Sequence, residues 1–155
     1  MVSPGKFLLM CLLSLLGTVS VALAHPVNVN SDGVAINGYD TVAYHRMEEA
    51  IPGSEEYSTD WNGATWWFSR AEHLELFTQN PEAYAPRYNG HCANGISDGH
   101  KVPGNPEIYR IIDGDLYLFF SQWGRLQWQF NQTEQIELAD RKWLRFQREL
   151  GYLRE

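Results

Sequence analysis

Residues 80–93 read NPEAYAPRYNGHCA, and we interpret the rest of the chain around this stretch. Its two prolines each fix the backbone φ near about −65° and stiffen the approach to His91 and Cys92. The dipeptide Asn89-Gly90 just before them favours a tight turn. A rigid segment that presents an imidazole beside a thiol is typical of a site for a soft or borderline metal ion.

The first 24 residues have the pattern of a secretory signal. Lys6 precedes an apolar run from Phe7 to Val21, and residues 22–24 (ALA) give the small-x-small pattern of a cleavage site. The apolar run of about 15 residues is shorter than the ~20 that cross a bilayer as a helix. We therefore predict a cleaved signal peptide at 1–24, a flexible N-terminal arm at 25–32 and one domain at 33–155. The product would be exported to the periplasm or the extracellular space, with no membrane span after cleavage.

Charge and cysteine content limit the possible partners. The chain has 19 acidic and 12 basic residues, a net charge of −7, which argues against nucleic acid or an anionic membrane surface. Of the two cysteines, Cys11 would leave with the signal, so Cys92 would be the only thiol of the exported protein. No intramolecular disulfide could then form, and in an oxidising compartment Cys92 must be buried, metal-bound or paired with another chain.

Turn signals predict two β-hairpins. Asn62-Gly63 lies between a candidate strand at 55–59 and a strand-forming run at 65–68. Asp113-Gly114 lies between a strand at 107–112 and another at 116–120. Shorter β-type runs are expected at Val34–Ile36 and at Val42–Tyr44. No internal repeat is expected.

Two principal helices are predicted from caps and apolar spacing. The first spans 70–79, with Ser69 as the N-cap and Glu72 completing a capping box. The second begins after Asn131 and ends at Gly151. Its apolar residues repeat at a spacing of three and four: Ile136, Ala139, Trp143, Phe146 and Leu150. Residues 81–85 favour a further helical turn, and 121–130 a short helix. The fold class is therefore α+β, with a small mixed or antiparallel sheet and two principal helices packed on it in a single domain.

Several motifs together resemble the exported YHS-domain family, in its branch with a single cysteine. They follow the family order from GYDTVAY at 38–44, through WWFS at 66–69 and NPEAYAP at 80–86, to YNGHCA at 88–93 and DGDLYL at 113–118. The resemblance implies an α+β domain. Related short YHS domains look like metal-binding modules with two cysteines, and those two positions fall here on Ser69 and His73. One imidazole thus stands in for the cysteine pair.

The principal functional hypothesis is non-catalytic binding of a transition-metal ion, copper first and zinc second, or of a small ligand. The candidate ligands are Cys92, His91, His73 and His45. Neighbouring residues of a strand point to opposite faces, so Cys92 and His91 can share one ion only if the backbone turns beside them. After cleavage, His25 would also offer an amine and an imidazole on one residue.

Two other classes of function stay open. In one, the chain binds a protein partner through its aromatic surface while Cys92 is buried and holds no metal. In the other, the chain is a thiol enzyme in which Cys92 acts with His91 or His73 and a carboxylate such as Asp98. The aromatic residues Trp61, Trp66 and Trp67 could face a ligand pocket or fill the core, and His100 is expected to be solvated.

Overall fold

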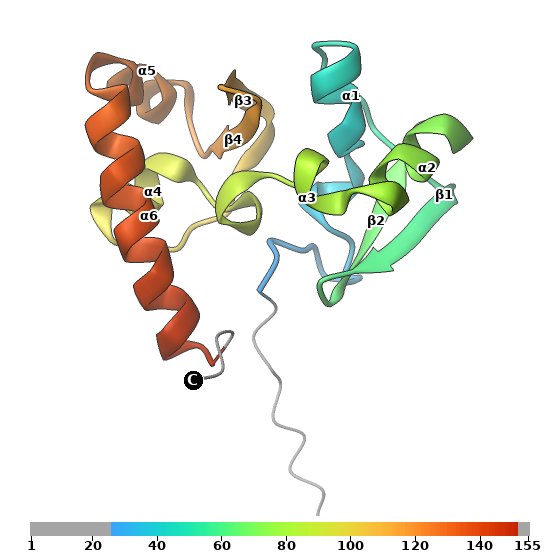
Figure 1. Cartoon of the computed structure of the whole chain (residues 1–155), viewed down its shortest axis with the longest axis horizontal. Helices are drawn as coiled ribbons and strands as arrows, with labels where there is room; N and C mark the ends of the chain where they lie inside the picture. The colour runs from blue at the N-terminus through green and yellow to red at the C-terminus, as the bar shows by residue number, and fades with distance from the viewer. Residues whose placement is uncertain (1–25, 152–155) are drawn as a thin grey trace, which may run out of the picture.

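The computed structural model describes residues 26–151, and this part of the chain consists of two halves that lie side by side (Figure 1). The predicted signal peptide and His25 lie outside the described residues. The first half contains η1 (Ile36–Gly38), α1 (Thr41–Arg46), β1 (Ser54–Trp61), β2 (Ala64–Phe68), α2 (Ala71–Gln79) and α3 (Pro81–Tyr84). The second contains η2 (Arg87–Gly90), α4 (Ala93–Asp98), β3 (Asn105–Ile112), β4 (Asp115–Phe119), α5 (Gln122–Phe130) and α6 (Gln132–Glu149).

The two halves repeat the same elements at nearly the same lengths. In both, a 3-10 turn is followed by a six-residue helix, strands of eight and five residues and a nine-residue helix. Both hairpins are antiparallel, and in both the register shifts within the longer strand. The expectation of no internal repeat is therefore wrong, because the chain contains one structural unit twice.

Equivalent hydrogen bonds join equivalent residues in the two halves, 51 or 52 positions apart. In each half, a glycine that follows a proline donates to the glycine that ends the 3-10 turn. The N-cap residue of the short helix donates to the carbonyl of the residue just before that proline. The pairs are Gly53 N to Gly38 O and Gly104 N to Gly90 O, then Asp40 N to Ile51 O and Cys92 N to Val102 O.

The repeat is carried by backbone conformation rather than by side chains. Three consecutive residues at 36–38 and again at 88–90 have positive φ, and the last two of each set are Asn-Gly. Gly38 and Gly90 have φ of +79° and +81°, a region that glycine occupies without strain. Apart from these pairs and the Pro-Gly pairs at 52–53 and 103–104, few residues are shared at equivalent positions, which explains why a search for repeated side chains misses the unit.

The α+β class and both predicted hairpins are confirmed. The strands form two separate two-stranded antiparallel sheets, one in each half, where the sequence suggested one sheet. Accordingly the two principal helices do not share a sheet, since α2 packs on β1 and β2 whereas α6 packs mainly on α4. Helices at 81–84 and 122–130 are also as expected.

Two local predictions in the first half are wrong for one reason. The run Val42–Tyr44 lies in helix α1, whose N-cap is Asp40. Ser69 does not cap α2, since the residue before that helix is Arg70 and it makes no side-chain cap bond. Ser69 instead donates from both its amide and its hydroxyl to Asp40. A buried carboxylate thus determines the conformation of both segments.

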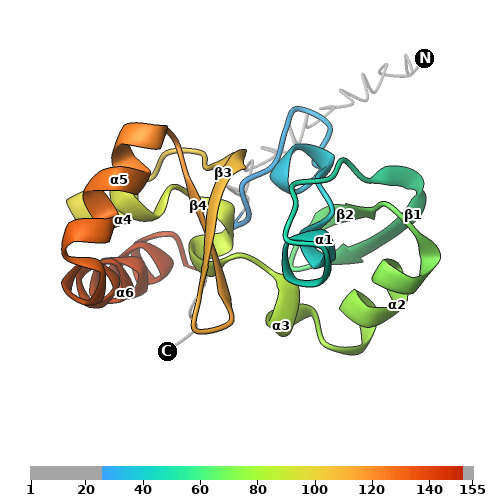
Figure 2. The same cartoon turned by 90° about the horizontal axis from the view of Figure 1, so that it is seen from above.

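Each half has an apolar core, and both apolar and polar contacts join the halves, because Leu116 and Leu118 of β4 pack in the first core. The first core is built around Trp66, Phe68 and Phe77, the second around Phe119 and Trp128. Both views place the hairpin β3–β4 on the side of its half that faces the first half (Figure 2).

Three tyrosine hydroxyls and the N-terminal segment cross between the halves. The contacts are Tyr44 to Pro106 O (2.8 Å), Tyr109 to Glu48 O (2.7 Å), Tyr39 to Glu107 (3.0 Å) and Asn28 N to Asn89 O (2.9 Å). Residues 26–30 are therefore packed rather than loose, and Val27 is buried in the first core.

Candidate functional site

Cys92 is a buried helix N-cap. Its side chain is 3% exposed, and its Sγ accepts a hydrogen bond from the amide of Gly95 at 3.4 Å. This contact satisfies one of the free amides in the first turn of α4. Among residues 26–151 no hydrogen bond joins this sulfur to a histidine, and the thiol is free of any disulfide.

His91 is also buried, at 6% exposure, and its contacts are those of a packed side chain rather than of a metal ligand. Its Nδ1 donates to the carbonyl of Tyr88 at 2.9 Å, and its ring lies 5.8 Å from the ring of Trp143. Burial lowers the pKa of His91 to about 4, and the positive charge of Lys101 acts in the same direction. The imidazole is therefore neutral at physiological pH and packs as part of the second core.

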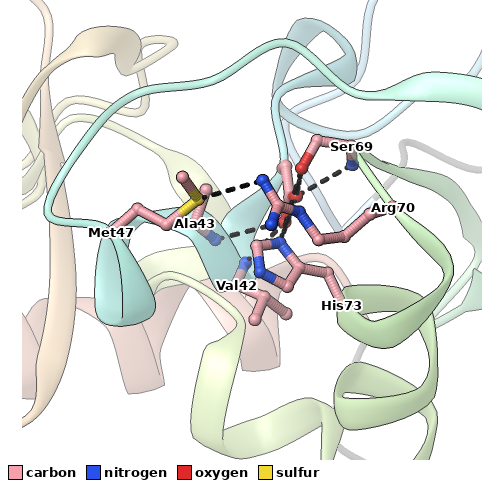
Figure 3. A network of polar contacts seen from close by, with 7 residues as sticks. Val42, Ala43, Met47, Ser69, Arg70 and His73 are labelled. Atoms are coloured by element: carbon pink, nitrogen blue, oxygen red, sulfur yellow. Dashed lines mark hydrogen bonds and ion pairs between the residues drawn. The ribbon is translucent and has the colours of Figure 1, made fainter.

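His73 belongs to a different site, a polar network around the fully buried carboxylate of Asp40. Figure 3 labels His73 beside Ser69, Val42 and Ala43, which belong to the same network. His73 Nδ1 donates to Asp40 Oδ2 at 2.6 Å, and the Ser69 amide and hydroxyl donate to the same oxygen at 2.8 and 2.6 Å. The other oxygen, Oδ1, caps α1 by accepting from the amides of Val42 and Ala43. Five hydrogen bonds thus compensate the burial of this charge.

The repeat explains both Asp40 and Cys92, because they occupy the same position in the two halves. Each caps the short helix that follows, and the amides of Ala43 and Gly95 that donate to them are equivalent. His73, which contacts Asp40, is replaced by Gly124 in the second half. A thiol is a weak acceptor and needs no charged partner, so Cys92 is explained by the architecture of the unit.

The four predicted ligands are not brought together. His73 lies in the first half beside Asp40, His45 lies at the end of α1 with its ring edge-on to Tyr84, and the remaining two lie in the second half. Within residues 26–151 no group of three or more His, Cys, Asp or Glu residues is placed to hold a metal ion. His100 is exposed, as expected.

The other predicted arrangements are partly present. The side chain of Asp98 is exposed and accepts from Asn94, and it makes no hydrogen bond to Cys92 in the described part of the chain. Trp66 is core, whereas Trp61 lines a hollow of about 380 Å³ between the halves together with Arg87, Tyr88 and Trp143. Trp61 thus both packs against the first core and lines this hollow.

The feature that sequence reasoning missed is an apolar surface on helix α5. Three large side chains of the helix and the residue just before its N-cap are exposed: Phe120 by 65%, Trp123 by 66%, Leu126 by 43% and Phe130 by 79%. Positions i, i+3 and i+7 of a helix share one face, so Trp123, Leu126 and Phe130 form one stripe. We call this stripe, together with Phe120, the α5 face.

The first half provides an internal comparison for this surface. The residues equivalent to the α5 face are polar, and those on α2 are exposed: Ser69 for Phe120, Glu72 for Trp123, Glu75 for Leu126 and Gln79 for Phe130. One inward position, by contrast, keeps its apolar character, with Phe77 and Trp128 both fully buried. Folding of the unit therefore does not require apolar residues on the outer side of its second helix.

The spacing of the apolar residues at 120–130 could have predicted this exposed surface from the sequence. Apolar residues stand at 120, 123, 126, 128 and 130, too many for one buried face of a nine-residue helix. The buried side is supplied by Gly124 and Trp128, so the other apolar residues must face outward.

Comparisons with known proteins do not identify the chain. No protein-family model, no curated protein and no solved structure matches it. Among the helices between residues 26 and 151, none is both long and apolar enough to span a membrane.

Proposed function

We propose that this chain is a protein-interaction module that binds a protein partner through the α5 face. The observation that supports the proposal is the difference between the two halves: one helix position carries polar side chains in the first and exposed aromatics in the second. Large exposed apolar patches mark interaction sites, and tryptophan and other aromatics supply most of the binding energy at protein interfaces.

The buried state of Cys92 and His91 supports the same proposal. Both residues are used by the second half for capping and packing, so the stretch at 80–93 serves the fold. Catalysis by Cys92 would need an accessible thiolate beside a base. Neither His91 nor His73 is placed to act as that base. The chain is therefore proposed as non-catalytic.

A photo-crosslinking amino acid at position 126 tests the proposal in the producing cells. A matched control carries the same amino acid at position 75, the equivalent outer site on α2. We expect a discrete crosslinked product at position 126 that disappears when Trp123→Glu is added, and none at position 75. Equal products at both positions, or none at 126, would contradict the proposal.

Metal binding is a second candidate, favoured by one contact. A carboxylate that accepts from one ring nitrogen of a histidine is the usual partner that orients a metal-ligating imidazole, and Asp40 accepts from Nδ1 of His73. Copper and zinc titrations of the wild-type chain, His73→Ala and Cys92→Ser test it. Stoichiometric binding lost in either variant would support a metal role for that residue.

Export through a signal peptide at 1–24 is part of the proposal. It predicts that the mature chain begins at His25, which N-terminal sequencing of the protein recovered outside the cytoplasm would detect.

A further inference from the structure

We infer that the partner of the α5 face is a second copy of this chain, bound through the same face in a two-fold dimer. The inference rests on the proposed function, since it names the occupant of the surface proposed there. Three observations lead to it: the neutrality of the surface, its polar rim and its size.

The surface is free of acidic residues in a chain of net charge −7. Between Leu116 and Thr133 the only charged residue is Arg125, which is half-buried and lies about 200° around the helix from Trp123. Two copies of an acidic protein repel each other over most of their surface. The α5 face itself carries no charge, so its own side chains add no like-charge repulsion when two copies meet.

The rim of the α5 face is self-complementary. Gln122 and Gln129 flank the stripe on one side and Gln127 on the other, and all three are exposed. A two-fold interface places each surface against a copy of itself. A glutamine amide both donates and accepts hydrogen bonds, so a glutamine rim can pair with an identical rim, whereas a rim of one charge sign could not.

The exposed apolar area of the α5 face is suited to a dimer that forms reversibly. Aromatic side chains offer about 150–250 Å² each, so at their exposed fractions the four residues leave roughly 500 Å² of apolar surface in water. A typical interface uses about 800 Å² of each partner, and the glutamine rim supplies part of the remainder. We therefore expect a reversible dimer rather than a permanent one.

Sedimentation equilibrium of the purified chain over about 1–200 μM tests the inference. We expect the wild type to approach the dimer mass, and Trp123→Glu and Leu126→Glu each to weaken association at least about tenfold. Both introduce the residue that the first half carries at the same position, so the fold tolerates them, and circular dichroism would verify this.

Leu144→Glu is the matched control, because Leu144 is 46% exposed on α6 and Leu126 is 43% exposed on α5. This variant should associate like the wild type. A wild type that stays monomeric at 200 μM overturns the inference, and so does a dimer that Trp123→Glu and Leu126→Glu leave unchanged.

The crosslinking experiment separates the two proposals. If the chain is monomeric but position 126 captures a different protein, the dimer is wrong and the proposed function stands. If the chain is monomeric and position 126 captures nothing, both are wrong.

Discussion

At the scale of single residues, position in the repeated unit explains side chains that sequence motifs assign to a site. Cys92 and Asp40 are the same capping position, filled by a thiol in one half and a carboxylate in the other. The sequence predicted the turn before Cys92 and the adjacency of His91. It could not predict that both side chains are buried, because burial is produced by contacts with Trp143 and the second core, far along the chain.

The thiol of Cys92 should be inert in the native protein. With 3% exposure it can react only when the second half opens. We expect a disulfide reagent to modify it at least about 100-fold more slowly in the native chain lacking residues 1–24 than in urea. Cys92→Ser provides the background rate. Rapid reaction that begins only after a chelator is added would instead indicate a metal-bound thiolate.

His91 should make the protein less stable as the pH falls. Its pKa is about 6.5 when the chain is unfolded and about 4 in the native protein. Between these values the unfolded chain binds more protons, so stability is complete above pH 6.5 and is lost as the pH falls toward 4. The loss between pH 7 and pH 5 should be about 2 kcal/mol.

Urea unfolding at the two pH values measures this loss. His91→Gln should lower it by most of that amount, whereas His100→Gln, at an exposed position, should leave it unchanged. An equal pH dependence in wild type and His91→Gln would show that other groups are responsible.

At the scale of elements, local signals were sufficient where the contacts are local. The Asn-Gly and Asp-Gly turns fixed both hairpins, and the apolar stripe of α6 fixed its buried side. Helix α1 was missed because its residues Thr41 to Tyr44 are all buried, and a helix buried on every side shows no periodicity. Its start is set by Asp40, whose partners His73 and Ser69 lie about 30 residues away.

Replacement of Asp40 should therefore destabilise the protein far more than replacement of Cys92, the equivalent residue of the second half. Asp40→Ala removes a helix cap and leaves Ser69 and His73 without their acceptor, which we expect to lower the free energy of unfolding by about 4 kcal/mol. Cys92→Ala removes one weak acceptor and a small packed side chain, for a loss of about 1–2 kcal/mol. Urea unfolding at pH 7 compares the two, and similar losses would contradict the central role of the carboxylate.

At the scale of the whole molecule, the two halves should unfold as one unit, because Leu116 and Leu118 of the second half belong to the core of the first. Tyrosine hydroxyls and the N-terminal segment join them, and the rings of Tyr44 and Tyr109 lie 4.7 Å apart across the boundary. Opening one half would leave the buried hydroxyl of Tyr44 without its acceptor, the carbonyl of Pro106. Loss of either half should therefore destabilise the other.

Gly53→Ala tests this coupling from the first half. A Cβ at Gly53 would lie 2.6 Å from the backbone carbon of Trp67, so β2 must shift, and we expect a loss of about 3 kcal/mol. Gly114→Ala is the control: nothing lies within 4 Å of its Cβ and only the positive φ opposes it, a cost of about 1 kcal/mol.

The reporter is the exposure of Cys92 in the second half, followed in urea beside far-UV circular dichroism. Because the halves share their boundary contacts, Gly53→Ala should lower the urea midpoint of Cys92 exposure as much as it lowers the midpoint of helix loss. If Cys92 kept its wild-type midpoint while the dichroism separated into two transitions, the halves would be independent domains. The α5 face would then belong to a unit able to bind its partner alone, whereas with coupled halves unfolding of the first half also removes the surface on the second.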